Sequence, residues 1–495
     1  MNKVVVTIFF VITGLLAGEK SSGQNVLSLE EVLVLAKEYS LEYQESKNAF
    51  LADYWAYKEF KLNLLPKINL NTTPVSAQRR LTERYDFENN VDIYRENKSI
   101  SSNAGLTVSQ ALPFSGGSIS ISSNLSRSQN FGMQDYTVFS STPFRISLSQ
   151  PLFAFNSYKW DKQELPIKLK KAKRKLIQAE QQLNQQVAKL YFNLVKSFQL
   201  HKLAQKEDAN SDSLLIQGKA LLKLHEITPL ELKEIQLKKT NAQINLDKRQ
   251  QSLIDAQFQL NKLLRGHLPK NFIPSILKNI PAVELNATEI LEKVQSRNPF
   301  YLDIAQQKID MQRQLAQAKK QDKLNASLNL SYGLNQQGEN FGAAYKSPLD
   351  QQSGSVSISI PLFKGGVNKG KLLLIQRNLE MEALKLEARV MDFEQQLSNK
   401  VLESIRDQNI FTNALQSRKL AQETYQMKQQ QYQLGRMTLQ ELNLTHIEML
   451  QAEENYLESV SNFWSNYYEL QSLTLHDLIH DQPLQVDFEP LMKLL

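Results

Sequence analysis

Two stretches of sequence decide the fold, because a counterpart of each recurs later in the chain. ISLSQPLF (146–153) is followed by LHEITPLEL (224–232), and VSISIPLF (356–363) is followed by LGRMTLQEL (434–442). Both pairs recur at an offset of 210 residues, so the same 77-residue span separates strand and turn in each copy. Internal duplication is a stronger guide to architecture than total length. The 495-residue chain is therefore predicted to contain two copies of one unit.

An upstream pair supports the duplication: residues 40–70 align with residues 298–328 at an offset of 258. Each half then reads as a helix, a strand region, a very long helix, a turn and another helix. Apolar residues at spacings of three and four predict the helices. The expected helices span about 28–64, 155–224, 229–264, 287–323, a long helix ending near 432, and 438–473. The expected division is a signal peptide at 1–23, repeats at 24–268 and 285–475, a linker at 269–284 and a C-terminal tail at 476–495.

The N-terminus reads as a secretory signal. Lys3 precedes an apolar run from Val4 to Ala17, and small residues follow at positions 21–23. The run falls short of the roughly 20 residues that cross a bilayer as a helix. No later stretch supplies such a helix, and the chain has no cysteine for disulfides or for a lipid-bearing N-terminus. We expect an exported chain whose mature part has no transmembrane helix.

Composition and motifs give no support for catalysis, cofactors or metal. The net charge of +7 is modest, and no nucleic-acid module accompanies it. GGVNKGK (365–371) approaches a phosphate-binding loop but has Leu372 where the hydroxyl residue belongs. His476 and His480 lie four residues apart without the glutamate of a zinc-enzyme motif. We therefore expect no enzyme, no cofactor, no metal site and no nucleic-acid partner.

The strand regions alternate apolar residues with serine and asparagine, which is the pattern of a barrel wall with one lipid-facing and one water-facing side. Aromatic residues flank these strands. Within lipid, only helices and closed barrels satisfy the hydrogen-bonding groups of the backbone, so strands of this kind indicate a barrel. Two principal strands per half make four, which is fewer than the smallest barrel needs. The barrel must then be shared between chains, and three chains give twelve strands with room for a passage. The alternative is a soluble periplasmic coiled-coil scaffold with a small closed strand domain.

The first strand region is 48 residues longer than the second. An extra hairpin at 103–127, turning at LPFSGG (112–117), accounts for the difference. We expect it to extend the extracellular end and to leave the strand count at twelve; the competing outcome is an eighteen-stranded trimer. The charged, unpatterned segment 82–99 is expected to be an exposed loop.

The chain resembles the TolC-type outer-membrane efflux proteins over essentially its whole mature length. The marks are LSLEEVLVLA near the start, QPLF and IPLF before each long helix, and YQLGRMTLQEL at the second turn. The resemblance implies a long α-helical coiled-coil barrel joined to a transmembrane β-barrel that three chains share. It also implies an outer-membrane location with a long periplasmic extension, and a periplasmic adaptor and an inner-membrane transporter as partners. The implied function is the exit duct of a tripartite efflux or type I secretion system.

The same resemblance places functional residues at the two helix turns. The implied periplasmic aperture consists of Glu231, Tyr432, Arg436 and Glu441. The implied adaptor-contacting tips are Leu224, Thr228, Leu434, Gly435 and Thr438. The chain departs from the family pattern at two positions: Met437 stands where some members have a constricting arginine, and His225 replaces the glycine of the first turn.

Overall fold

The computed structural model describes residues 25–131, 135–275, 286–320, 324–363, 365–434 and 436–493. The expected signal peptide, most of the expected linker and Gly435 lie outside these ranges. Contacts divide the chain into two compact units, each drawn from both predicted repeats. Unit 1 comprises Met1–Tyr43, Gln182–Val283 and Ser404–Glu469, and unit 2 comprises Gln44–Gln181, Glu284–Glu403 and Leu470–Leu495.

The first half of the chain contains the elements β1 (Asn25–Leu27), α1 (Leu29–Tyr39), α2 (Leu41–Asn63), β2 (Lys67–Asp86), β3 (Val91–Leu112), β4 (Gly117–Phe131), β5 (Tyr136–Pro151), α3 (Ser157–Lys223), α4 (Pro229–Leu263) and β6 (Phe272–Pro274). The second half contains α5 (Ala287–Arg297), α6 (Pro299–Lys320), β7 (Asn325–Gly338), α7 (Ala343–Lys346), β8 (Leu349–Ser359), α8 (Val367–Gln433), α9 (Leu439–Thr474), β9 (His476–Asp477), β10 (Gln482–Pro483) and α10 (Glu489–Lys493). The two long helices and the helices that follow them agree with the sequence prediction to within a few residues.

Unit 1 is a set of long helices packed around a narrow core. Tyr191 of α3 is fully buried, and its hydroxyl lies 2.8 Å from the backbone oxygen of Leu27 and 2.7 Å from that of Ser275. Leu27 ends β1 and Ser275 directly follows β6, and these two strands form a short parallel pair. Burial raises the pKa of Tyr191, so the hydroxyl stays protonated and can act as a donor. One buried side chain thus anchors the start of the described chain and the segment after α4 to the long helix.

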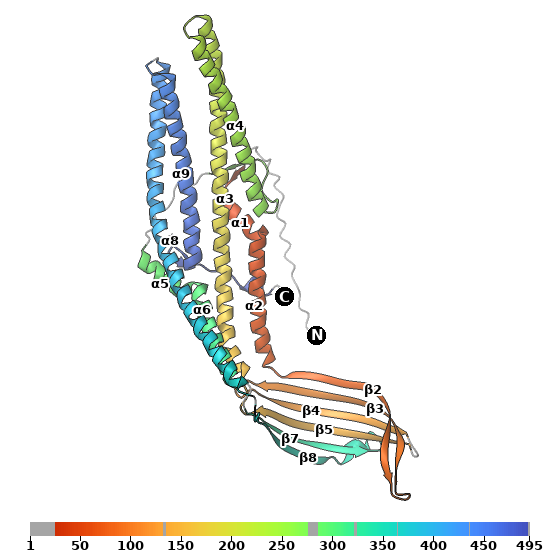
Figure 1. Cartoon of the computed structure of the whole chain (residues 1–495). Coiled ribbons are helices and arrows are strands. Elements are labelled where there is room, and N and C mark those ends of the chain that lie inside the picture. The colour runs from red at the N-terminus through yellow and green to blue at the C-terminus, as the bar shows by residue number, and fades with distance from the viewer. Residues whose placement is uncertain are drawn as a thin grey trace, which may run out of the picture. The chain divides into compact units, whose positions relative to one another are not determined.

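Unit 2 contains one antiparallel sheet in the order β2-β3-β4-β5-β7-β8 (Figure 1). The strands β2 to β5 come from the first half of the chain, and β7 and β8 come from the second. The ends of the helices meet one end of this sheet. Asn156, just before α3, donates to the oxygen of Pro113 at 2.9 Å, and Lys320 at the end of α6 donates to the oxygen of Ala154 at 3.1 Å.

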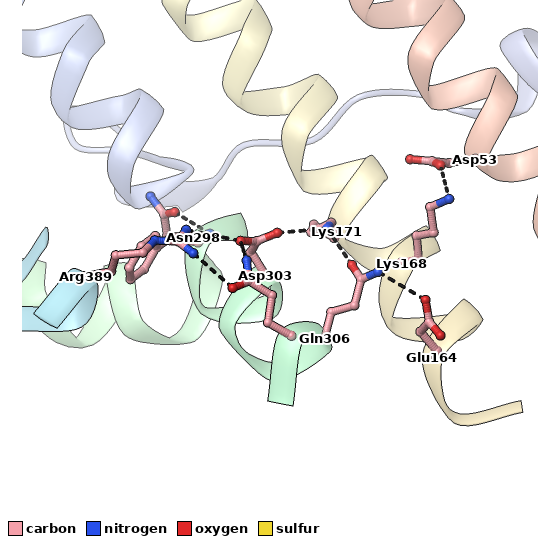
Figure 2. A network of polar contacts seen from close by, with 10 residues as sticks. Asp53, Glu164, Lys168, Lys171, Asn298, Asp303, Gln306 and Arg389 are labelled. Atoms are coloured by element: carbon pink, nitrogen blue, oxygen red, sulfur yellow. Dashed lines mark hydrogen bonds and ion pairs between the residues drawn. The ribbon is translucent and has the colours of Figure 1, made fainter. Parts of the chain in front are cut away.

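The helices of unit 2 are joined by a network of ion pairs on four of them (Figure 2). Asp303 of α6 pairs with Lys171 of α3 at 3.0 Å and with Arg389 of α8 at 3.3 Å, and Lys168 pairs with Asp53 of α2 at 3.1 Å. Burial opposes ionisation of Asp303, but Lys171 and then Arg389 outweigh it and hold the pKa of this carboxyl below its ordinary value. Part of the basic run KLKKAKRK (168–175) is therefore engaged in pairing helices.

Two sequence expectations about the strands are wrong. The chain contributes six strands to the sheet, not four, because the hairpin at 103–127 pairs fully with its neighbours. The segment 82–99 is strand in large part, not loop: the ends of β2 and β3 form a ribbon that turns at Phe87–Asn90. Asn90 takes the left-handed conformation (φ 50°), and the Asp86 carboxylate accepts a hydrogen bond from the Glu88 N–H at 3.1 Å. The backbone ladder of this ribbon runs from Leu81 opposite Glu96 to Asp86 opposite Val91, and Glu96 also forms an ion pair with Arg79 across the strands.

Two helices expected to be continuous are each broken, and the breaks lie 258 residues apart. The first is at Ser40, between α1 and α2, and the second is at Asn298, between α5 and α6. Both residues are buried, with extended backbone. Pro299 disfavours helical geometry at Asn298, and the Asn298 amide then donates to the Leu473 oxygen at 2.7 Å. Among the described helices, none is long and apolar enough to cross a membrane.

Candidate functional site

The six-stranded sheet has one apolar face, which its register defines. Residues directly opposite each other in paired strands point to the same face. One row of partners runs Ile68, Val108, Ile121, Ile146 and Tyr332 from β2 to β7. The apolar band, as we call this face, consists of Ile68, Leu70, Leu106, Val108, Ile119, Ile121, Phe144, Ile146, Leu148, Leu328, Leu330, Tyr332, Val356 and Ile358.

The apolar band is open in a single chain. Its exposed fractions include 71% for Leu70, 45% for Ile121 and 61% for Ile358. A continuous exposed patch of this kind, several strands wide, is unusual on the surface of a monomer in water. The band therefore needs another apolar phase or partner to cover it.

The opposite face of the same strands is polar. One row of partners consists of serines from five strands, Ser109, Ser120, Ser147, Ser331 and Ser353. The hydroxyls of Ser331 and Ser353 lie 2.8 Å apart, and the Ser149 hydroxyl donates to Asn329 at 2.9 Å. Short hydroxyl side chains make this face polar and leave the space in front of it open to water. The two faces together have the pattern of a membrane wall lining an aqueous passage.

The two helix turns of unit 1 carry the same cap. Thr228 precedes α4 and Thr438 precedes α9, and each hydroxyl accepts from the backbone N–H of the glutamate three residues on, Glu231 at 3.2 Å and Glu441 at 3.3 Å. Each glutamate accepts in return from the backbone N–H of its threonine, at 2.6 Å and 3.0 Å. These are capping boxes, which satisfy N–H groups left over at a helix start. The sequences TPLE and TLQE carry this signal, which the sequence analysis missed.

The capping hydrogen bonds also set the charge state of both glutamates. Donation from the threonine N–H, and then from its hydroxyl, lowers the pKa of Glu231 and of Glu441 below the ordinary glutamate value. Both carboxylates therefore stay ionised at neutral pH and place a negative charge at each turn. Within one chain, each carboxylate caps the start of its own helix.

Tyr432 lies in a different setting from the two glutamates. It lines a cavity of about 280 Å³ between α3, α4, α8 and α9, together with Glu207, Lys238, Tyr425 and His446. The Tyr425 and His446 rings stack with centroids 5.0 Å apart, and His446 Nδ1 lies 3.6 Å from a Glu207 oxygen. Lys238 forms a hydrogen bond with Asn443 across the helices. Burial lowers the pKa values of both Lys238 and His446.

The remaining predicted positions lie at the exposed ends of the turns. Leu224 and Leu434 are each 67% exposed, and the Arg436 side chain is also exposed while its N–H donates to the Gln431 oxygen at 2.9 Å. His225 has φ 59°, a left-handed conformation that strongly favours glycine. Gly435 lies outside the described residues. Within the described part of the chain, no ion pair joins Arg436 to Glu231 or Glu441.

The cavity residues Glu207, Lys238 and His446 were missed from the sequence. They sit on three helices, and only the folded helix pairs bring them together. For metals, no group of three or more suitable side chains comes together among the described residues. His476 and His480 are not on one helix as their spacing suggested: His476 belongs to β9, and His480 pairs locally with Asp477 at 2.7 Å.

Comparison with solved structures shows the fold. The crystal structure of the Campylobacter jejuni CmeC outer membrane channel is 12% identical, with a TM-score of 0.66 over 100% of this chain and 98% of that one. The open state of the Neisseria gonorrhoeae MtrE outer membrane channel is 16% identical, with a TM-score of 0.59 over 92% and 91% of the two chains. The outer membrane protein VceC from Vibrio cholerae is 12% identical, with a TM-score of 0.59 over 92% and 97%.

Sequence comparison gives a family match over part of the chain. Residues 291–474 match the family described as outer membrane efflux protein, whereas no curated protein matches the chain significantly. The matched region runs from α5 to the end of α9 and includes β7 and β8 with their part of the apolar band. The family match and the fold agree with the resemblance seen in the duplicated motifs: residues 291–474 match the outer membrane efflux protein family, and the whole chain has the fold of solved outer-membrane channels.

Proposed function

We propose that three copies of the chain form an outer-membrane channel, the exit duct of a tripartite efflux or type I secretion system. The observation that carries the proposal is the two-faced sheet. The apolar band is uncovered in one chain, and a serine-rich face lies behind it. A closed barrel with lipid outside and water inside gives each face the surroundings it needs. The number three follows the resemblance to TolC-type proteins.

Exposed apolar stripes on the helices support association of copies. On α4 the stripe comprises Leu230, Leu237, Ile244 and Phe258, which repeat at multiples of seven residues and are 47% to 67% exposed. On α8 it comprises Leu373, Leu384, Met391, Leu402, Leu420 and Met427, at steps of 7, 11 or 18 residues and 46% to 68% exposed. These steps keep a residue on one helix face. Coiled-coil packing against helices of neighbouring copies would cover both stripes.

The helix turns are the proposed periplasmic end of the duct. Leu224, Thr228, Leu434, Gly435 and Thr438 form the tips that contact a periplasmic adaptor, with exposed leucines as the apolar anchors. Glu231, Tyr432, Arg436 and Glu441 narrow the aperture when three copies bring their turns together. The passage is passive, and adaptor and inner-membrane transporter open it. In this arrangement each charge at the tip is present three times around the axis.

Fractionation and heat-modifiable migration test the proposal. The mature chain should be recovered in the outer-membrane fraction and migrate as a trimer in unheated detergent samples, then as a monomer after heating. The alternative, a soluble periplasmic coiled-coil scaffold, predicts recovery in the periplasmic extract and no heat-dependent shift. That result would remove the channel proposal.

A further inference from the structure

The hairpin formed by β3 and β4 has the properties of a wall element. It lies inside the sheet, between β2 and β5. Its strands pair along their whole shared length, from Lys98 opposite Phe131 to Leu112 opposite Gly117. β4 then pairs with β5 from Ser118 to Asn130. Taking this hairpin out of the sheet would break the β2–β3 and β4–β5 ladders and leave β2 without its neighbour.

The apolar band runs through the hairpin without interruption. Leu106 and Val108 of β3 and Ile119 and Ile121 of β4 continue the row between Ile68 on one side and the apolar face of β5 on the other. The polar face is continuous as well, with Ser109 opposite Ser120 and Ser120 opposite Ser147. A hairpin that lay in water outside the membrane would expose these apolar residues to solvent. Continuity with the apolar band instead indicates that the hairpin lies within the membrane wall.

The turn of the hairpin lies at the helix end of the sheet, so the hairpin does not lengthen the far end. The Asn156 amide before α3 holds the Pro113 oxygen in this turn. Gly116 has φ 75°, and a Cβ at Gly117 would lie 2.8 Å from the Ser149 oxygen, so the turn sequence suits close packing there. The part that continues beyond the sheet is instead the charged β2–β3 ribbon turning at Phe87–Asn90 (Figure 1).

The two edges of the sheet are complementary to each other. Among the described strands, β2 and β8 each pair on one side only. β2 leaves the helix end and β8 returns to it, so β8 of one copy can pair antiparallel with β2 of the next. Ile68 and Leu70 on one edge and Val356 and Ile358 on the other keep the apolar band continuous across such a junction. A head-to-tail contact of this kind gives a closed ring when the rotation between copies is a whole fraction of a turn.

Resting on the trimeric channel proposed above, we infer that its barrel has eighteen strands, six from each copy, with β8 of one chain paired to β2 of the next. At a strand spacing of about 4.8 Å and a tilt near 40°, twelve strands give a barrel about 24 Å across and eighteen about 36 Å. The cross-section roughly doubles. The duct would then be wider at its outer-membrane end than that of a twelve-stranded relative and admit bulkier cargo there.

Disulfide trapping tests this directly, because the chain has no cysteine of its own. All substitutions lie on the polar face. Ser355→Cys in β8 is combined with Asn69→Cys or Asn71→Cys in β2, which samples two registers of the junction. A second pairing joins Ser355→Cys to Ser120→Cys in β4, and a third joins Asn71→Cys to Ser147→Cys in β5. Each single-cysteine chain is the matched control and must retain the heat-modifiable trimer.

The eighteen-stranded barrel predicts oxidation of a β8–β2 variant to a ladder of covalent species ending at three chains, with the other two pairings unlinked. An intermolecular β8–β4 link, an intrachain β2–β5 link, or a ladder ending at two chains overturns it. So does a heat-modifiable trimer in which neither β8–β2 register is linked, although the channel itself then survives. Loss of trimer in the single-cysteine controls and the unmodified chain alike would overturn the channel proposal as well.

Discussion

Replacing Ile146 with arginine should damage assembly far more than replacing its neighbour Ser147 with arginine. Ile146 lies in the apolar band, opposite Ile121 on one side and Tyr332 on the other. Ser147 points to the opposite face, between Ser120 and Ser331. The two substitutions introduce the same charge one residue apart, so they differ in the face that receives it.

The magnitude follows from the surroundings of each face. An arginine on the lipid face of a barrel costs about 2 to 4 kcal/mol near the membrane midplane, whereas a polar lumen tolerates it. Since about 1.4 kcal/mol is a factor of ten in an equilibrium, the Ile146→Arg chain should lose roughly 30-fold to 700-fold in its folding equilibrium. If side-chain volume alone decided the outcome, Ser147→Arg would do more damage than Ile146→Arg, because the change from serine to arginine is the larger increase in size.

The assay is the yield of heat-modifiable trimer in the outer membrane, followed by denaturant unfolding of the purified proteins in lipid vesicles. We expect Ser147→Arg to keep most of its trimer and Ile146→Arg to lose it. Equal tolerance of the two substitutions, or greater damage at Ser147, would refute the assignment of the faces.

Three further predictions concern the helices. Arg436→Ser combined with Tyr432→Phe should raise single-channel conductance in planar bilayers without loss of trimer; unchanged conductance would place the constriction elsewhere, for example at the Glu231 or Glu441 carboxylates. The pKa values of these two carboxyls are lowered in the fold, so their capping contribution is present in full above the ordinary glutamate pKa near 4.5 and is lost as pH falls through the lowered values. Hydrogen exchange at the starts of α4 and α9 should therefore quicken on acidification below about pH 4.5, relative to helix centres, and Glu231→Gln with Glu441→Gln, which removes both titrating carboxyls, should abolish this pH dependence; an unaltered dependence would count against the caps. Asp303→Asn should lower the thermal midpoint more than Glu380→Gln, because Asp303 joins α3, α6 and α8 while Glu380 pairs with Arg377 on one exposed helix face; the same shift in both would deny the network a role.

Periodicity was sufficient to predict the long helices. In α3 the apolar residues Leu183, Val187, Leu190 and Leu194 recur at helical spacing, and the helix ends within a residue or two of the expected limits. The breaks at Ser40 and Asn298 were missed because they depend on burial and on the Leu473 carbonyl, which is distant in sequence. A proline following Asn298 was the local signal for one of them.

The strand count failed for a different reason. Segment 82–99 is rich in charge, and its strand state depends on pairing with the rest of β2 and β3. The hairpin at 103–127 was correctly expected from its turn, but its place between β2 and β5 follows from hydrogen bonding across the sheet. Alternation along one strand gives its two faces and does not give its neighbours.

Some residues of the candidate site could be predicted from the sequence and others could not. Thr228, Glu231, Thr438 and Glu441 were expected at the turns from the family resemblance, and their capping role could have been predicted from the three-residue spacing. The cavity that Tyr432 lines together with Lys238 and His446 could not be predicted from the sequence, since these residues come from different helices with no shared motif.

Planar-bilayer recording of the purified, heat-modifiable protein tests the central claim most directly. A channel should give discrete, stepwise conductance from the unmodified chain, with step size raised when Arg436 and Tyr432 are replaced. Addition of pure, natively folded protein that never inserts and never conducts, at any potential the bilayer withstands, would contradict a channel and favour a soluble scaffold.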